Sequence, residues 1–166
     1  FEYNDIDGLK AMFKKYKDRV AAVIMEPVIA EKPKDNFLQK VKDLTHENGA
    51  LLIFDEMISG FRFAMGGIQE YLDVVPDLAT FGKGLTNGMP LGVLAGKEEY
   101  MKEFDKVFLS STYAPEALTL AATSANIDFY KKNNVINELW NKGRHIENGF
   151  NLVIDKYSIR KNISLA

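Results

Sequence analysis

Two patterns of apolar residues alternate along this chain, and together they predict alternating helices and strands. Apolar side chains recur at helical spacing in residues 5–18, 36–49, 98–106, 114–132 and 135–153. Short, nearly continuous apolar runs, typical of buried strands, lie at residues 20–27, 50–56, 77–81 and 92–96. This order predicts an α/β fold with a mostly parallel sheet between two layers of helices, a three-layer αβα arrangement.

Several residues mark the expected ends of these elements. Asn36 is predicted to cap the helix at 36–49, and Gly49 is predicted to end it. Pro115 lies near the first turn of the helix at 114–132, where the missing N–H does no harm. We also expect a short crossover helix at 66–73, between the strands at 50–56 and 77–81.

The strand at 50–56 ends in two acidic residues, Asp55 and Glu56. Ligands of open α/β sheets bind beyond the carboxyl ends of the strands, and Asp55 lies at such an end. The predicted strand at 77–81 has its carboxyl end at Phe81, so the loop after Phe81 lies at such an edge as well. Because successive side chains of a strand point to opposite faces, Glu56 is expected to have a structural role.

Composition narrows the function classes. The hydrophobic content of 46% allows an ordinary core, and 166 residues suffice for one domain. The net charge of −2, with no basic stripe, argues against a nucleic-acid partner. There is no cysteine, which fits a reducing compartment, so we expect a cytoplasmic protein without a Cys-based zinc site; no other metal site is predicted. No apolar run approaches the roughly 20 residues of a membrane span.

The start of the chain carries no leader pattern. Residues 1–8 include neither a Met start nor a basic segment followed by an apolar one, so we expect no signal peptide. The chain is therefore interpreted as an interior piece of a longer protein.

A strand that delivers an aspartate occurs in P-loop ATPases, where the aspartate holds Mg²⁺. That function also requires a phosphate loop of the form G-x-x-x-x-G-K-S/T before the strand. Nothing upstream of residue 50 resembles it, and the downstream segment 92–98 is one residue too short and places Glu98 after Lys97. The ATPase remains an alternative only if the loop is missing from this chain.

Pyridoxal phosphate (PLP) enzymes also need a carboxylate, which holds the protonated ring nitrogen. They further need a lysine for the Schiff base and donors for the phosphate. Lys83 lies 28 residues after Asp55, which suits the ends of two neighbouring strands, and Gly82, Gly84 and Gly88 allow a tight turn there. Hydroxyl donors follow in residues 110–112, ahead of the long helix.

Four segments together resemble the class III PLP-dependent aminotransferases, most closely the branch around glutamate-1-semialdehyde aminomutase. They are EPV (26–28), GALLIFDEMISGFR (49–62), PDLATFGKGLTNGMPLG (76–92) and SSTYAPEALTLAA (110–122). Their order and spacing are specific as a set, although each alone is weak. The resemblance implies that the chain is part of the large domain of a fold-type I PLP-dependent transferase.

The resemblance also implies roles for individual residues. Asp55 would pair with the pyridine nitrogen, Met57 would pack on a face of the ring, and Lys83 would be the Schiff-base lysine. Thr112 would reach the phosphate of PLP bound mainly by the neighbouring subunit, which implies a homodimer with shared active sites. The substrates would be small amino and keto compounds.

The sequence departs from the family pattern at several positions. The aminomutase branch has an Asn five residues after the Glu of EPV, and many other members have a Gln three residues after the Asp. Those positions are Glu31 and Ile58 here, so no partner for the phenolic oxygen of PLP is assigned. Pro115 and Glu116 replace the usual Gly-Asn pair. The family's main phosphate-binding loop lies upstream of Phe1, so we expect the isolated chain to be inactive.

For the other polar and aromatic candidates we expect structural roles. Arg62 is expected to pair with a local acid and hold its turn, rather than to bind a substrate carboxylate. His46 and His145 are expected to be ordinary surface histidines. Trp140 is expected to pack in the core rather than against a cofactor.

The sequence thus predicts a transaminase or aminomutase that moves an amino group through a Lys83 Schiff base. Residues 1–130 would form the C-terminal part of the PLP-binding large domain, and residues 131–166 would form a connecting helix and the start of the small C-terminal domain. A class III racemase or decarboxylase and a non-catalytic, dimerising remnant remain as alternatives.

Overall fold

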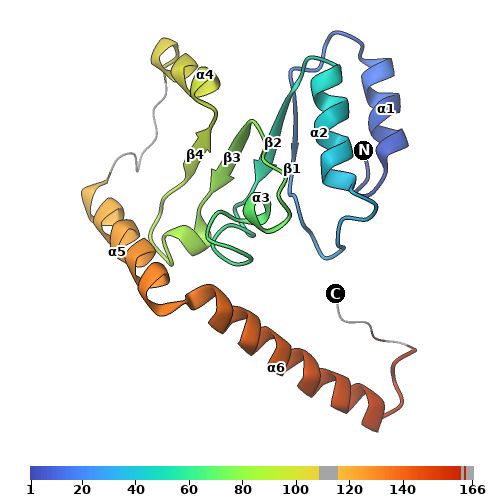
Figure 1. Cartoon of the computed structure of the whole chain (residues 1–166), viewed down its shortest axis with the longest axis vertical. Helices are drawn as coiled ribbons and strands as arrows, with labels where there is room; N and C mark the ends of the chain where they lie inside the picture. Colours follow the sequence, from blue (N-terminus) through green and yellow to red (C-terminus); the bar gives the residue numbers. More distant parts are fainter. Residues whose placement is uncertain (109–115, 162, 164–166) are drawn as a thin grey trace.

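The computed structural model describes residues 1–108, 116–161 and 163, and Figure 1 shows how their elements are arranged. The helices are α1 (Ile6–Lys15), α2 (Phe37–Glu47), α3 (Ile68–Tyr71), α4 (Glu98–Met101), α5 (Ala117–Asn133) and α6 (Val135–Lys156). The strands are β1 (Ala22–Met25), β2 (Leu51–Asp55), β3 (Leu78–Phe81) and β4 (Val93–Gly96). Two 3₁₀ turns, η1 (Lys83–Leu85) and η2 (Lys102–Lys106), complete the described elements.

The four strands form one sheet in the order β1-β2-β3-β4. β1 and β2 pair in parallel, β2 and β3 pair in parallel, and β4 runs antiparallel to β3. In the β2–β3 register, Asp55 lies opposite Thr80. The predicted α/β class and mostly parallel sheet are confirmed, and β4 is the one described strand that reverses direction.

The main core lies on one face of this sheet. Leu52, Phe54 and Ala79 point into it and are almost completely buried. Helices α1 and α2, which lie side by side in Figure 1, cover the core with apolar side chains. These are Leu9, Phe13, Phe37, Leu38 and Val41. The opposite face is less covered, because Ile24 of β1 keeps 62% of its surface exposed.

The ends of α2 agree with the predictions in position but not in mechanism, and α5 differs from its prediction. Asn36 is the N-cap of α2, as predicted, but it adopts a left-handed φ of 58° and its side chain makes no capping hydrogen bond. The left-handed φ of 70° at Gly49 fits the predicted helix exit. At α5 the cap is Glu116, whose carboxylate accepts from the N–H groups of Leu118 and Thr119. The described helix therefore begins at Ala117, later than predicted.

A break at Asn134 separates α5 from α6, with a left-handed φ of 50° at that residue. Trp140 of α6 donates from Nε1 to the Phe63 carbonyl at 3.1 Å and stacks on Tyr71, so it has the packing role expected for it. Within residues 1–108 and 116–161, no helix combines the length and the apolar character needed to cross a membrane.

Candidate active site

The carboxyl edge of β2 and β3 holds the first part of the candidate site. Asp55 is the last residue of β2 and is half-buried. Its Oδ1 accepts a hydrogen bond from the Met57 backbone N–H at 3.0 Å and another from Thr80 Oγ1 at 3.2 Å. The sheet and the bend after it thus fix the orientation of this carboxylate.

Lys83 follows β3 at the same edge of the sheet and begins the turn η1. The Leu85 N–H donates to the Gly82 carbonyl at 2.8 Å, and the Asn87 N–H donates to the Lys83 carbonyl at 2.8 Å. Lys83 itself has a left-handed φ of 39°, a conformation that costs energy for a residue with a side chain. The turn therefore holds an exposed lysine in a backbone geometry that the surrounding hydrogen bonds enforce.

Met57 connects these two parts of the site. Its Sδ and Cε atoms lie against Gly82, so a Cβ at position 82 would overlap the thioether. Gly82 needs no unusual φ, and a Cβ there would meet both the end of the Met57 side chain and, at 3.1 Å, the Leu91 carbonyl oxygen. Gly88 has a φ of 112°, which explains the glycine where the turn closes. Asp55, Met57 and Lys83 thus all lie at or after the carboxyl ends of β2 and β3, at one edge of the sheet, and their roles there stay predictions.

Helix α5 supports the lysine turn from outside the motif. Asn126 Nδ2 donates to the Gly84 carbonyl at 3.1 Å and to the Leu85 carbonyl at 2.8 Å. Phe61 packs edge-to-face on Tyr130 of the same helix, with ring centroids 5.9 Å apart. The sequence pattern did not identify Asn126, because an isolated polar residue within a helix carries no indication of a contact 41 or 42 residues away.

Glu56 has the structural role predicted for it. Its side chain is completely buried, and its carboxylate accepts from the Ser59 hydroxyl, from the Ile68 N–H at 2.9 Å and from the Gln69 N–H at 3.1 Å. These two N–H groups are at the start of α3, so Glu56 caps that helix from the neighbouring strand. A side chain at Gly67 would collide with this carboxylate.

The prediction that Arg62 pairs with a local acid is wrong. Arg62 is exposed, and no carboxylate of the described residues lies within ion-pair distance of its guanidinium. The turn that it was expected to hold is instead closed by backbone hydrogen bonds, including one from the Arg62 N–H to the Ser59 carbonyl at 3.1 Å.

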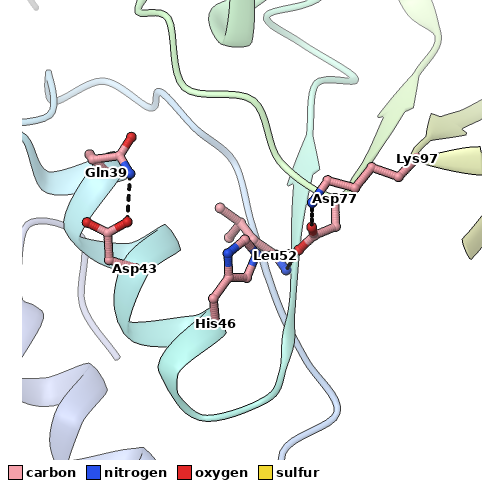
Figure 2. Close-up of polar contacts among 6 residues, drawn as sticks. All are labelled: Gln39, Asp43, His46, Leu52, Asp77 and Lys97. Atoms are coloured by element: carbon pink, nitrogen blue, oxygen red, sulfur yellow. Dashed lines mark hydrogen bonds and ion pairs between the residues drawn. The ribbon is translucent and has the colours of Figure 1, made fainter. Parts of the chain in front are cut away.

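The opposite edge of the sheet contains a cluster that the sequence did not indicate, shown in Figure 2. Asp77 is 1% exposed and accepts from the Leu52 N–H at 2.8 Å, from Lys97 Nζ at 2.6 Å and from His46 Nε2, which lies 2.8 Å away. His46 is exposed, as expected of a surface histidine, but its contact with Asp77 was not predicted. Its partner is 31 residues away in sequence and becomes a neighbour only when the sheet forms.

The electrostatics of this cluster are mutually favourable. Burial alone would raise the pKa of Asp77, but the hydrogen bonds from Lys97, Leu52 and His46 outweigh it and lower that pKa below its ordinary value. The same hydrogen bond to Asp77 raises the pKa of Lys97. Lys97 is the lysine of the segment considered for a phosphate loop, and here it is paired with a carboxylate, which argues against the P-loop alternative.

Ser110, Ser111 and Thr112, the predicted phosphate donors, lie outside the described residues. The position of Thr112 relative to Asp55 and Lys83 is therefore still a prediction.

The strand order and directions define an α/β domain in which Asp55 and Lys83 follow the carboxyl ends of the neighbouring parallel strands β2 and β3. Comparison with known proteins gives the family: the model of the class III aminotransferases matches residues 3–164. The chain belongs to the class III aminotransferase family.

Two curated relatives are similar over nearly the whole chain. The glutamate-1-semialdehyde 2,1-aminomutase of Methanosphaera stadtmanae is 37% identical over 170 residues, which is 98% of this chain and 40% of that protein. The 3-aminobutyryl-CoA aminotransferase of Cloacimonas acidaminovorans is 37% identical over 171 residues, which is 99% of this chain and 41% of that protein. The chain thus spans about 40% of the length of these relatives.

A solved structure supports the fold. The FumI protein of Sphingopyxis sp., in its PLP internal aldimine form, matches 95% of this chain and 40% of its own length. The TM-score is 0.89 at 24% identity. The three-layer fold-type I architecture predicted from the sequence is confirmed at the level of the family and the fold.

Proposed function

We propose that the protein containing this chain uses PLP to move amino groups, as a transaminase or an aminomutase. The observation that carries the proposal is the placement of Asp55 and Lys83 at the same edge of the sheet, with Met57 between β2 and the lysine turn. Membership of the class III aminotransferases supports the same chemistry.

The side chains of this edge fit the needs of PLP. Lys83 is exposed, and no carboxylate of the described residues pairs with its amine, so the amine can reach an aldehyde. Asp55 keeps one carboxylate oxygen, Oδ2, without a hydrogen bond to the described chain. When bound, PLP supplies a ring that draws electrons from the substrate carbon next to the amine nitrogen.

In this proposal each residue has one task. Asp55 provides a fixed negative charge for the ring nitrogen, an electrostatic contribution placed where charge develops. Lys83 would hold the coenzyme through its amine and would move a proton to and from the substrate carbon. Met57 would pack against the ring, and Thr112 would bind the phosphate across a homodimer interface.

The substrates are proposed as small amino and keto compounds. The two curated relatives carry different names, an aminomutase and an aminotransferase of a CoA ester, at the same identity of 37%. The chain therefore supports the amino-group chemistry more strongly than any one substrate. A racemase or decarboxylase of the same family and a non-catalytic remnant are the alternatives. The division at residue 130 and a cytoplasmic location also stay predictions.

The test is to trap the lysine in the full-length protein. After incubation with PLP, we expect a visible Schiff-base absorption band, and after borohydride reduction we expect the label on the peptide that contains Lys83. Lys83→Ala should abolish both the band and the label, and Lys40→Ala, which removes an exposed lysine on α2, should leave both unchanged. A label on another peptide, or no label, would remove the proposal.

Product analysis separates the alternatives. Transamination converts an amino donor into a keto compound, whereas racemisation changes only the configuration of the donor and decarboxylation releases CO₂. We expect a keto product or an amino group moved within the substrate. A labelled Lys83 with no product of any of these kinds would support the non-catalytic remnant.

A further inference from the structure

We infer that Thr80 is a positioning residue for Asp55, and that its hydroxyl orients the carboxylate toward the ring nitrogen of PLP. This inference rests on the proposed function and adds a residue to it. Thr80 lies in β3, between the segments that carry Asp55 and Lys83.

The register of the sheet places Thr80 directly beside Asp55. Both side chains are half-buried and lie on the same face of adjacent parallel strands. Thr80 Oγ1 donates to Asp55 Oδ1 at 3.2 Å, and the Met57 N–H donates to the same oxygen at 3.0 Å. Both hydrogen bonds therefore hold one carboxylate oxygen, and within the described chain Oδ2 receives none.

Two donors on one oxygen have a physical consequence. They restrict rotation of the carboxylate, so Oδ2 stays at a fixed place where another donor can meet it. A β-branched threonine suits this task, since its χ1 angle is restricted and its hydroxyl is held in place.

A purely structural role for Thr80 leads to different expectations. Threonine is common in strands because of its shape, and valine has nearly the same shape without the hydroxyl. If only the shape matters, Thr80→Val should leave both the binding of PLP and its visible spectrum unchanged. If the hydroxyl matters, Thr80→Ser should behave like the wild type even though it loses a methyl group.

The test uses the full-length protein loaded with PLP and has two readouts besides activity. One is the dissociation constant of PLP, and the other is the pH at which the visible Schiff-base band changes. We expect Thr80→Val to weaken PLP binding about tenfold, the effect of losing one hydrogen bond to a charged group, and to shift the pH of the spectral change. We expect Thr80→Ser to restore both readouts.

Thr45→Val is the matched control. Thr45 is a fully buried threonine on α2, and its hydroxyl has no hydrogen-bond partner among the described residues. We expect both readouts of this variant to equal those of the wild type. If Thr80→Val does not fold, Thr80→Ala compared with Thr80→Ser separates the hydroxyl from the side-chain shape.

Unchanged PLP binding and an unchanged spectrum in Thr80→Val would overturn the inference. Equal changes in Thr80→Val and Thr80→Ser would also overturn it, because the hydroxyl would then not be the cause. A wild-type protein that forms no Schiff base at Lys83 would instead remove the proposed function. A wild type labelled at Lys83, with Thr80→Val matching it, would refute only the role of Thr80.

Discussion

Two adjacent carboxylates at the end of β2 have opposite surroundings. Asp55 is half-buried beside Thr80, and Glu56 is completely buried beneath α3. The alternation of side chains along a strand predicted this division, because it requires only the local pattern. Roles that depend on distant residues were not predictable. The contact between His46 and Asp77 arises from tertiary structure, and so does the lack of an acid beside Arg62 within the described residues.

Replacing Glu56 by glutamine should destabilise the protein. The Glu56 carboxylate accepts three hydrogen bonds, and an amide has one oxygen, so the amide NH₂ would face at least one backbone N–H of α3. We expect Glu56→Gln to lower the free energy of unfolding by about 2 kcal/mol, measured by urea denaturation. Glu70→Gln is the control. The exposed Glu70 accepts a hydrogen bond from the Gly66 N–H, and its substitution should lower the free energy of unfolding much less. Equal losses in both variants would contradict this account.

At the level of elements, the order of helices and strands was predictable because it depends on local apolar patterns. The direction of β4 was not, since a short apolar run has the same pattern in either orientation. Asn36 was predicted as the N-cap of α2 because of its residue type. Its side chain makes no capping hydrogen bond, and its left-handed φ shows that the backbone conformation, and not the side chain, ends the loop before the helix. The support of η1 by α5 could not be predicted either.

Loss of the Asn126 side chain should loosen the lysine turn. Its amide bonds two carbonyls of η1, so Asn126→Ala would leave both without that donor. We expect faster hydrogen exchange in residues 82–88 and about tenfold weaker PLP retention in the full-length protein. Asn133→Ala is the matched control, because Asn133 only bonds a carbonyl of its own helix. Unchanged exchange in Asn126→Ala would refute a role for α5 in holding the turn.

The Asp77 cluster should make the free energy of unfolding depend on pH in the acid range. Because the folded-state pKa of Asp77 is lowered, its contribution is complete above the unfolded-state value of about 4 and is lost as the pH falls through the folded pKa. We expect Asp77→Asn to lower the free energy of unfolding by about 2 kcal/mol at neutral pH and to reduce its decline below about pH 4.

Urea denaturation at several pH values measures this effect. Asp43→Asn, at an exposed position of α2 that also appears in Figure 2, should keep the wild-type pH dependence. An acid decline in Asp77→Asn as steep as in the wild type would show that other groups cause it.

At the scale of the whole molecule, this chain accounts for about 40% of its curated relatives, and its surface is consistent with that. In Figure 1, α6 extends away from the sheet. Its apolar side chains are largely exposed, with Leu152 at 74% and Phe150 at 55%. Single exposed apolar residues are ordinary, but a series along one helix indicates a surface that other parts of the protein cover.

We therefore expect the isolated chain of residues 1–166 to self-associate. Its apparent mass in size-exclusion chromatography with light scattering should rise with concentration, since association buries exposed apolar side chains of α6. Replacing Phe150 and Leu152 together by glutamate should reduce the association. A chain that remains monomeric at all concentrations would contradict this expectation.

The contact between Met57 and Gly82 links two positions that are 25 residues apart in sequence. A shorter side chain at position 57 would remove the overlap of a methyl group at position 82 with the thioether, and the methyl group would then only have to fit 3.1 Å from the Leu91 carbonyl oxygen. Over evolutionary time the two sites should consequently drift as a pair, with alanine or serine at 82 tolerated in lineages that carry valine or a smaller residue at 57. Enzyme engineers who reshape one of these positions would then have to choose the other at the same time.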